Sequence, residues 1–426
     1  MQRFETKALH GGYAPDATGS RAVPVHRTSA YLFKDADHAA DLFALRQLGN
    51  IYTRLGGPTQ EVLETRLAEL EGGKAALALA SGTAAIHYTV INICRQGDEL
   101  VSSSTLYGGT HTMFAAILPD AGITTRFVDI HDFDAVRAAI NERTRLIYTE
   151  VIGNPALDVA NIEALSAIAH EHNLPLVVDA TFTTPYLFRP LEYGADIVIH
   201  SLTKWIGGHG TAIGGAVIDG GSFDWTDPKF ALYNEPDPSY HGLRYAHDLG
   251  ELSPLAFILR MRLVPLRNLG ACLSPDNCWI FLQGLETLAL RMERHSENAL
   301  QAAEFLAGHP KVSWVRYPGL PGDPSYDLAR TMFPRGFGGM VVFGVKGGLE
   351  AGLEAGRDFI NRLRLVSHLA NVGDAKSLAI HPASTTHSQL SEAEQAAGGI
   401  TPDLVRFSVG IEHIDDILAD LDQALE

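Results

Sequence analysis

The sequence is poor in cysteine. Its 426 residues include three cysteines, Cys94, Cys272 and Cys278, and no CxxC pair. An odd and sparse set argues against a disulfide framework, fits a reducing cytoplasm and speaks against a zinc site built on paired cysteines. His170 and His172 stand close together, but residues two apart on a helix point to different sides. No metal site is therefore expected.

The sequence also lacks an excess of basic residues, a long apolar run and a targeting signature. Its net charge is −17 at pH 7. Such a balance cannot neutralise the phosphates of a nucleic acid, so nucleic acid is not expected as a partner. No stretch of about 18 apolar residues occurs, and the first residues carry neither an apolar run nor a cleavage signature. We expect no membrane span and a cytoplasmic location.

Two common nucleotide-binding signatures are missing as well. No GxGxxG motif follows the first expected strand, and no P-loop is present, because Lys204 precedes its neighbouring glycines instead of following them. Neither a dinucleotide-dependent enzyme nor a nucleoside triphosphatase is therefore favoured.

What the sequence does contain, from Pro58 onward, is a regular alternation of apolar strands and helices. Continuous apolar strands separated by helices indicate a largely parallel sheet that is buried on both faces. The fold class is thus α/β. Strands are expected at residues 75–79, 100–101, 145–148, 175–178, 197–199 and 214–218.

The rest of the chain divides around this region. Residues 1–57 lack an amphipathic period, and such a long irregular opening suggests an N-terminal arm that contacts a neighbouring subunit. The large domain then spans residues 58–273, with an irregular insertion at 221–270 where prolines interrupt the pattern. Ser274 caps a long helix that is expected to run to about Leu306. With it begins a smaller C-terminal α+β domain, 274–426.

Polar residues gather where the expected strands end. If the sheet is parallel, these carboxyl ends share one edge, where open α/β sheets place their ligands. Capping and turn formation alone do not readily explain such a gathering. The residues concerned are Ser81, Tyr107, Glu150, Asn154, Asp179, Ser201, Thr203 and Lys204.

Lys204 is the centre of this set. Alone it has two interpretations: a solvated lysine beside flexible glycines, or a lysine that binds an aldehyde cofactor as an imine. If the cofactor is pyridoxal phosphate, Asp179 can keep the ring nitrogen protonated and Tyr107 can stack on the ring. A tyrosine in such a position is, however, more often simple packing.

Two further groups suit the same cofactor and an amino-acid substrate. Small residues at a strand-to-helix turn leave N–H groups free for a phosphate, although Ser81 also suits a plain helix cap. Arg406 lies in an apolar run near the C-terminus, where it is either a structural ion pair or a fork for a carboxylate. The expected phosphate ligands are Gly82, Thr83, Ser201 and Thr203.

With these residues in place, the sequence strongly resembles the Cys/Met-metabolism family of pyridoxal-phosphate enzymes. The resemblance covers nearly the whole chain. It implies an aspartate-aminotransferase-like fold (fold type I) with a largely parallel seven-stranded sheet. The matching motifs, in chain order, are Tyr52-Thr53-Arg54, Ser81-Gly82-Thr83, Tyr107-Gly108-Gly109-Thr110, Asp179-Ala180-Thr181, Ser201-Leu202-Thr203-Lys204 and His381-Pro382-Ala383-Ser384.

The resemblance also implies roles that spacing does not show. Tyr52 and Arg54 look like the pair that reaches a neighbour's cofactor phosphate, in a homotetramer built from dimers with shared active sites. Tyr52 is also expected near the substrate. Asn154 resembles the residue beside the pyridine hydroxyl. Asn371 stands where most members carry a serine that helps to hold the substrate carboxylate, and with the long insertion it resembles the O-acetylhomoserine sulfhydrylase branch.

The implied reaction is γ-replacement, in which Lys204 moves protons, acetate leaves O-acetyl-L-homoserine, and sulfide or a thiol such as methanethiol adds. The product is homocysteine or, from methanethiol, methionine. The enzyme alternatives are an O-succinylhomoserine sulfhydrylase, a cystathionine γ-synthase and a methionine γ-lyase, although Gly109 replaces the cysteine typical of the last. A catalytically silent scaffold of the same fold is the alternative from another class. The intact Lys204 and Asp179 argue against it.

Overall fold

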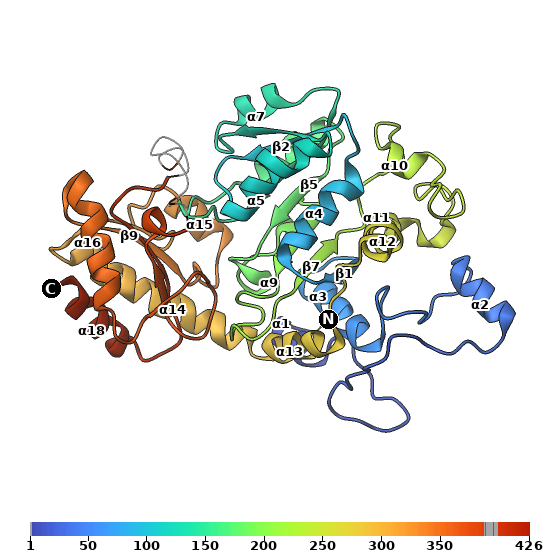
Figure 1. Cartoon of the computed structure of the whole chain (residues 1–426), viewed down its shortest axis with the longest axis horizontal. Coiled ribbons are helices and arrows are strands. Elements are labelled where there is room, and N and C mark those ends of the chain that lie inside the picture. The colour runs from blue at the N-terminus through green and yellow to red at the C-terminus, as the bar shows by residue number, and fades with distance from the viewer. Residues whose placement is uncertain (1, 387, 389–394, 396–398) are drawn as a thin grey trace.

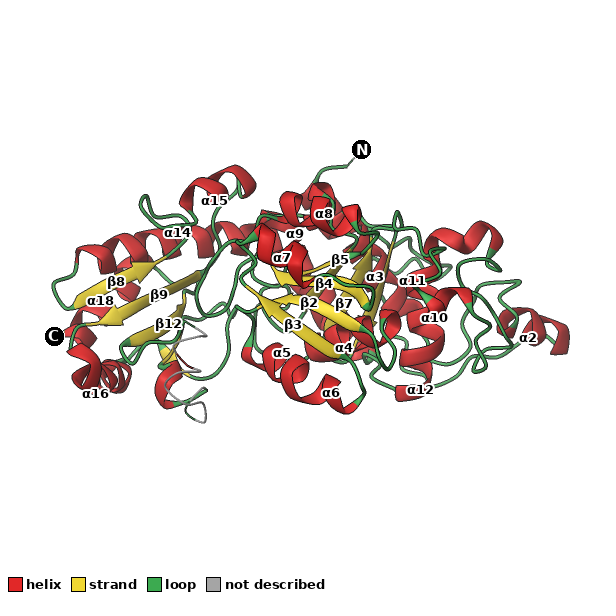
Figure 2. Ribbon diagram, turned by 90° about the horizontal axis from the view of Figure 1, so that it is seen from above, coloured by secondary structure: helices red, strands yellow, loops and turns green. Residues whose placement is uncertain are grey.

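The computed structural model describes residues 2–386, 388, 395 and 399–426. Two sheets lie next to each other along the long axis of the molecule, each with its own helices (Figures 1 and 2). In this part of the chain no helix is long and apolar enough to cross a membrane.

The larger sheet has seven strands in the order β1-β7-β6-β5-β4-β2-β3. Among the described strands of this sheet, β7 alone runs in the opposite direction to the other six. The expected largely parallel seven-stranded sheet is thereby confirmed. The strands are β1 (Ala75–Leu79), β2 (Glu99–Ser103), β3 (Thr124–Val128), β4 (Thr144–Glu150), β5 (Leu176–Asp179), β6 (Ile197–Ser201) and β7 (Gly215–Asp219).

Strand β3 has no counterpart among the strands expected from the sequence. It lies at the edge of the sheet and its first residues, such as Thr124 and Arg126, are partly or fully exposed. An edge strand need not be apolar on both faces. The apolar run that marks the central strands is therefore absent there.

Helices cover both faces of the larger sheet (Figure 2). Successive residues of one strand enter two separate cores: Val198 packs on one side, and Ile197 and Ile199 pack on the other. Alternation of this kind explains why the central strands are apolar throughout. The helices around this sheet include α3 (Pro58–Glu71), α4 (Gly82–Ile93), α5 (Gly108–Thr112), α6 (Leu118–Asp120), α7 (Phe133–Ala139), α8 (Ile162–Glu171) and α9 (Thr184–Leu187).

The insertion is less irregular than its prolines suggest. After α10 (Ala231–Asn234) and the 3₁₀ turn η3 (Gly250–Leu255), helical structure is continuous through α11 (Ala256–Met261), the π-turn η4 (Arg262–Leu266) and α12 (Arg267–Leu269). The expectation of an irregular segment was therefore wrong for its last part. Pro265 lies inside the π-turn, a helix variant with a different hydrogen-bond spacing, so the proline does not end the helix.

The C-terminal part begins with two helices in place of the single one expected. Thr287 separates α13 (Pro275–Glu286) from α14 (Leu288–Gly308), with φ −112° and ψ 8°. A five-stranded sheet in the order β10-β11-β12-β9-β8 follows. Its elements are β8 (Val312–Arg316), α15 (Tyr326–Met332), β9 (Met340–Val345), α16 (Gly348–Arg362), β10 (Ser367–His368), β11 (Leu378–Ile380), β12 (Leu404–Ser408) and α18 (Ile414–Leu425).

The first 57 residues contain two short helices, α1 (Phe4–His10) and α2 (Ala36–Phe43), joined by long connections. Helix α1 packs on α3 and α13. The segment around α2 extends away from the larger sheet (Figure 1). Leu32 in this segment is 98% exposed, which is unusual for a leucine and leaves apolar surface uncovered in the single chain.

Candidate active site

Lys204 lies in the turn after β6, at the carboxyl edge of the larger sheet. Its Nζ donates a hydrogen bond of 2.6 Å to Oδ1 of Asn371. Burial, and secondarily the positive charge of Arg406, lower the pKa of the Lys204 amine to about 8. Because a neutral amine is the nucleophile, this environment suits imine formation far better than a solvated loop would.

Asn371 reaches Lys204 from the segment that follows the short strand β10 of the smaller sheet. Gly373 packs against the Lys204 turn with φ +77°, and a Cβ there would lie 2.6 Å from the Trp205 nitrogen. The Ala375 N–H donates to the Gly208 carbonyl oxygen at 2.8 Å. Lys204 and Asn371 belong to segments 167 residues apart in sequence, which thus form one wall of the site.

Arg406, on β12, is the second cation of the site. Its Nη1 donates to Oδ1 of Asn154 at 3.3 Å, and no carboxylate among the described residues pairs with it. Burial lowers the pKa of its guanidinium to about 10. A structural ion pair is therefore not what holds this arginine within the described chain. A buried cation without an anion is a suitable receptor for a carboxylate.

Asp179 has a carboxylate neighbour. It lies opposite Glu150 in the register of β5 and β4. Burial raises the pKa of Asp179, and burial together with the charge of Asp179 raises the pKa of Glu150 well above its ordinary value. The Thr181 N–H donates to Asp179 at 2.9 Å. Two carboxyl groups thus lie at the strand ends, where a cationic ring nitrogen would favour their ionised form and be stabilised in return.

Tyr107 lies directly before helix α5, with 49% of its surface exposed. Its N–H donates to Oε1 of Glu150 at 2.7 Å. The ring is therefore not a packed core aromatic, and the backbone of Tyr107 is held by Glu150. Glu150 was noticed in the sequence only as a strand-end residue. Its contact with Tyr107 depends on a loop path that periodicity does not reveal.

The start of α4 offers donors for an anion. Ser81 caps the helix by accepting the Ala84 N–H at 3.0 Å, while the N–H groups of Gly82 and Thr83 have no partner within the helix. A Cβ at Gly82 would lie 2.7 Å from Cβ of Ser201, so Ser201 stands against the helix start. Both the capping role and the anion-binding role of this turn are thus compatible with the structure.

Thr203 is more strongly engaged within the protein than expected. Its hydroxyl accepts the Gly214 N–H at 3.1 Å and donates to the Gly214 carbonyl oxygen at 3.3 Å. The side chains of Tyr52 and Arg54 contact each other and the segment around Arg267. The Arg54 guanidinium lies 5.2 Å from the centre of the Tyr52 ring and donates to the Arg267 carbonyl oxygen. No hydrogen bond of the described chain links this pair to Lys204.

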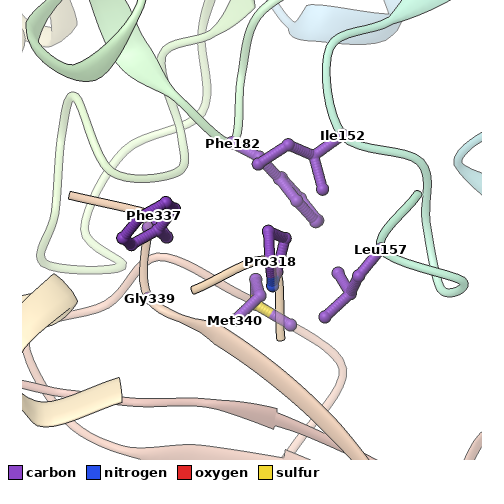
Figure 3. Close-up of a pocket in the computed structure, with 8 residues that line it drawn as sticks. Ile152, Leu157, Phe182, Pro318, Phe337, Gly339 and Met340 are labelled. Carbon is purple, nitrogen blue, oxygen red and sulfur yellow. The ribbon is translucent and has the colours of Figure 1, made fainter. Parts of the chain in front are cut away.

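A small apolar pocket adjoins the site between the two sheets (Figure 3). Ile152 and Leu157 line it from the turn that carries Asn154, Phe182 lines it from the segment after Asp179, and Met340 lines it from β9. It leaves no room for a water molecule. Its role is to pack the junction behind Asn154, and the chemistry lies in the polar groups beside it.

The polar groups fit pyridoxal phosphate: an amine of lowered pKa, carboxylates near a cationic ring nitrogen, a free aromatic face and open N–H groups at a helix start. The sequence matches the profile of the "Cys/Met metabolism PLP-dependent enzyme" family over residues 5–426. The chain therefore belongs to this family, and pyridoxal phosphate is its cofactor.

Individual relatives are similar over their full length. The chain is 55% identical to the O-acetyl-L-homoserine sulfhydrylase of Leptospira meyeri, covering 99% of this chain and 96% of the relative. It is 49% identical to the homocysteine synthase of Schizosaccharomyces pombe, with 100% and 98% coverage. A crystal structure of the putative O-acetylhomoserine (thiol)-lyase of Campylobacter jejuni, which contains N'-pyridoxyl-lysine-5'-monophosphate, matches with a TM-score of 0.95, 42% identity and 100% coverage of both chains.

Proposed function

We propose that the protein replaces the acetate of O-acetyl-L-homoserine by sulfide and so forms L-homocysteine. The relatives named above support the substrate and the reaction class. The observation in the structure that carries the proposal is the contact of the Lys204 amine with Asn371, near Arg406, which forms an ion pair with no carboxylate of the described residues. A base and a carboxylate receptor within one buried site are what an amino-acid substrate requires.

The residues divide into those that hold the cofactor and those that hold the substrate. Lys204 would carry the cofactor, Asp179 would face its ring nitrogen, Asn154 would lie by its hydroxyl, and Tyr107 would cover its ring. Gly82, Thr83, Ser201 and Thr203 would hold its phosphate. When bound, pyridoxal phosphate supplies an electron sink for the substrate carbons.

The protein supplies the binding and the proton transfers. Arg406 binds the substrate carboxylate as a fork, and the side chain of Asn371 contacts both this carboxylate and the Lys204 amine. Lys204 removes the proton from the α-carbon, assists removal of a proton from the β-carbon, and returns protons after acetate has left and sulfide has added. General acid–base catalysis of this kind contributes about 10²–10⁴-fold.

A substrate panel tests this proposal. Acetyl-, succinyl- and phospho-homoserine would each be combined with sulfide, methanethiol and cysteine. We expect the highest kcat/KM for the acetyl ester with sulfide, and homocysteine as the product. A higher kcat/KM for the succinyl ester, or for cysteine as the acceptor, would contradict the proposal.

We further propose a cytoplasmic homotetramer built from dimers, in which Tyr52 and Arg54 of the partner subunit complete each site. The exposed apolar surface of the N-terminal arm supports an oligomer, and the three unpaired cysteines support a reducing compartment. Sedimentation of the holoenzyme tests the assembly: a monomer at micromolar concentration would contradict it. Cell fractionation tests the location.

A further inference from the structure

Asp158 occupies a central position in a network outside the proposed set of site residues. It lies in the turn after β4 that carries Asn154. The turn closes on itself, since the Gly153 N–H donates to the Asp158 carbonyl oxygen at 2.9 Å and the Leu157 N–H to the Gly153 carbonyl oxygen at 3.0 Å. Because Asn154 lies inside this closed turn, whatever fixes the turn also fixes Asn154.

The Asp158 side chain points out of this turn toward the segment that precedes Tyr107. Its Oδ2 accepts the Thr105 hydroxyl at 2.9 Å and also lies 3.0 Å from Nε2 of His131. Thr105 is in turn 3.1 Å from the Ser103 hydroxyl at the end of β2. Three separate loops, those after β2, β3 and β4, thus meet at one carboxylate oxygen.

The close approach depends on a glycine. A Cβ at Gly153 would lie 2.3 Å from Oδ1 of Asp158 and 3.1 Å from the Thr105 hydroxyl oxygen. No side chain fits between the turn and the Thr105 segment. The opposite side of the same turn is apolar, since Ile152 and Leu157 face the pocket at the junction with the smaller sheet (Figure 3).

We propose that Asp158 is a positioning residue of the active site, which holds the Asn154 turn and the Tyr107 segment at a fixed separation. The Tyr107 segment is then fixed at two points, by Asp158 through Thr105 and by Glu150 through the Tyr107 N–H. This inference rests on the functions proposed above for Asn154 and Tyr107. Asp158 itself contacts neither the substrate nor the cofactor.

His131 makes the arrangement sensitive to pH. Its hydrogen bond to Asp158 raises its pKa, and Asp129 acts in the same direction, while burial and the charge of Arg316 oppose the rise. The ion pair is present below the raised pKa of His131 and is lost as the pH rises through it. The charge of Asp158 also contributes to the raised pKa of Glu150.

The test compares Asp158→Ala, Thr105→Val and the double variant as holoenzymes. Small displacements of positioned groups cost up to about 10²-fold in rate. We expect each single variant to lose about tenfold to a hundredfold in kcat/KM, and the double variant to lose no more than the worse single one. The visible circular dichroism of the bound cofactor should change in all three, because it reports ring orientation and does not depend on turnover.

Asp196→Asn is the matched control. Asp196 also forms a hydrogen bond with a histidine, since its Oδ2 lies 2.9 Å from Nε2 of His170. It directly precedes β6, however, at the end of the strand opposite to Lys204. The control should retain the wild-type kcat/KM and dichroism, even if its melting temperature falls. Wild-type dichroism and kcat/KM in Asp158→Ala, or additive losses in the double variant, would overturn the inference.

Two further variants extend the test. Asp158→Asn keeps an acceptor for Thr105 if the alanine variant does not fold, and it should show a smaller loss. For His131→Gln, the ratio of wild-type to variant kcat/KM should fall toward one as the pH rises, and a ratio independent of pH would contradict the role of His131. If the wild type makes no homocysteine, the proposed function fails, but the dichroism still decides the inference about Asp158.

Discussion

Glu150 and Asp179 face each other on adjacent parallel strands, and both carboxyl groups are held at a raised pKa by burial. Two like charges this close disfavour each other's ionisation. Ionisation of the pair therefore weakens the fold of the cofactor-free protein, but the same carboxyl groups lie where a cationic ring nitrogen would be stabilised. Stability and function are in tension at this point.

The first prediction concerns Glu150→Gln. The amide keeps an oxygen for the Tyr107 N–H but removes the buried charge. Because the folded-state pKa of Glu150 is raised, the wild type loses stability as the pH rises from the unfolded pKa through the folded one. The variant should melt about 2 °C or more above the wild type at pH 8 in the cofactor-free form, and the difference should vanish near pH 4. If the variant and the wild type melted at the same temperature at both pH values, Glu150 would not carry a destabilising charge in the folded protein.

The second prediction concerns Lys204. Its amine has a pKa of about 8, and only the neutral form attacks an aldehyde. The rate of cofactor capture by the cofactor-free protein, followed by absorbance, should rise about tenfold per pH unit below that value and then level off. In Arg406→Leu the midpoint should move to higher pH, whereas Arg294→Leu on the exposed face of α14 should leave it unchanged. Lys204→Ala should show no covalent capture and no turnover.

The third prediction concerns Arg406→Lys. A lysine keeps the charge but cannot bind a carboxylate as a fork. We expect KM for the amino acid to rise about tenfold or more, as for loss of one charged hydrogen bond, with a smaller effect on kcat. KM for sulfide should stay near the wild-type value. Unchanged kinetics would remove Arg406 from the substrate site.

The fourth prediction concerns Arg54→Ala. Within one chain Arg54 contacts Tyr52 and the Arg267 carbonyl oxygen, and no hydrogen bond of the described residues links it to Lys204. If it serves the partner's cofactor, the variant should release pyridoxal phosphate faster during dialysis. Mixed with Lys204→Ala under conditions of confirmed subunit exchange, it should recover part of the activity, because some sites receive both intact residues. Absence of recovery would mean that each subunit has a self-contained site.

The sequence predicts the larger sheet well, because its central strands are buried on both faces and therefore continuously apolar. It also places Lys204 and Asp179 correctly at strand ends. No such periodic signal marks three other features: the exposed edge strand β3, the π-helical segment around Pro265 and the break at Thr287. Each depends on tertiary packing or on a local helix variant that a count of apolar residues does not detect.

For the site, the residues on strand ends were accessible to prediction and the contacts between loops were not. Asn371 and Arg406 were assigned to the substrate, but their proximity to Lys204 and Asn154 follows from how the two sheets pack. Nothing in the sequence marks Asp158 as a positioning residue. An aspartate four residues after Asn154 has no distinctive spacing, and only the glycine at 153 hints that two segments approach closely.

The most direct measurement is the stoichiometry of products from purified holoenzyme given O-acetyl-L-homoserine and sulfide. The proposed function predicts one homocysteine and one acetate for each ester consumed, with no activity in the Lys204→Ala variant. Release of ammonia and a keto acid in place of homocysteine, or equal product formation by the Lys204→Ala variant, would contradict it.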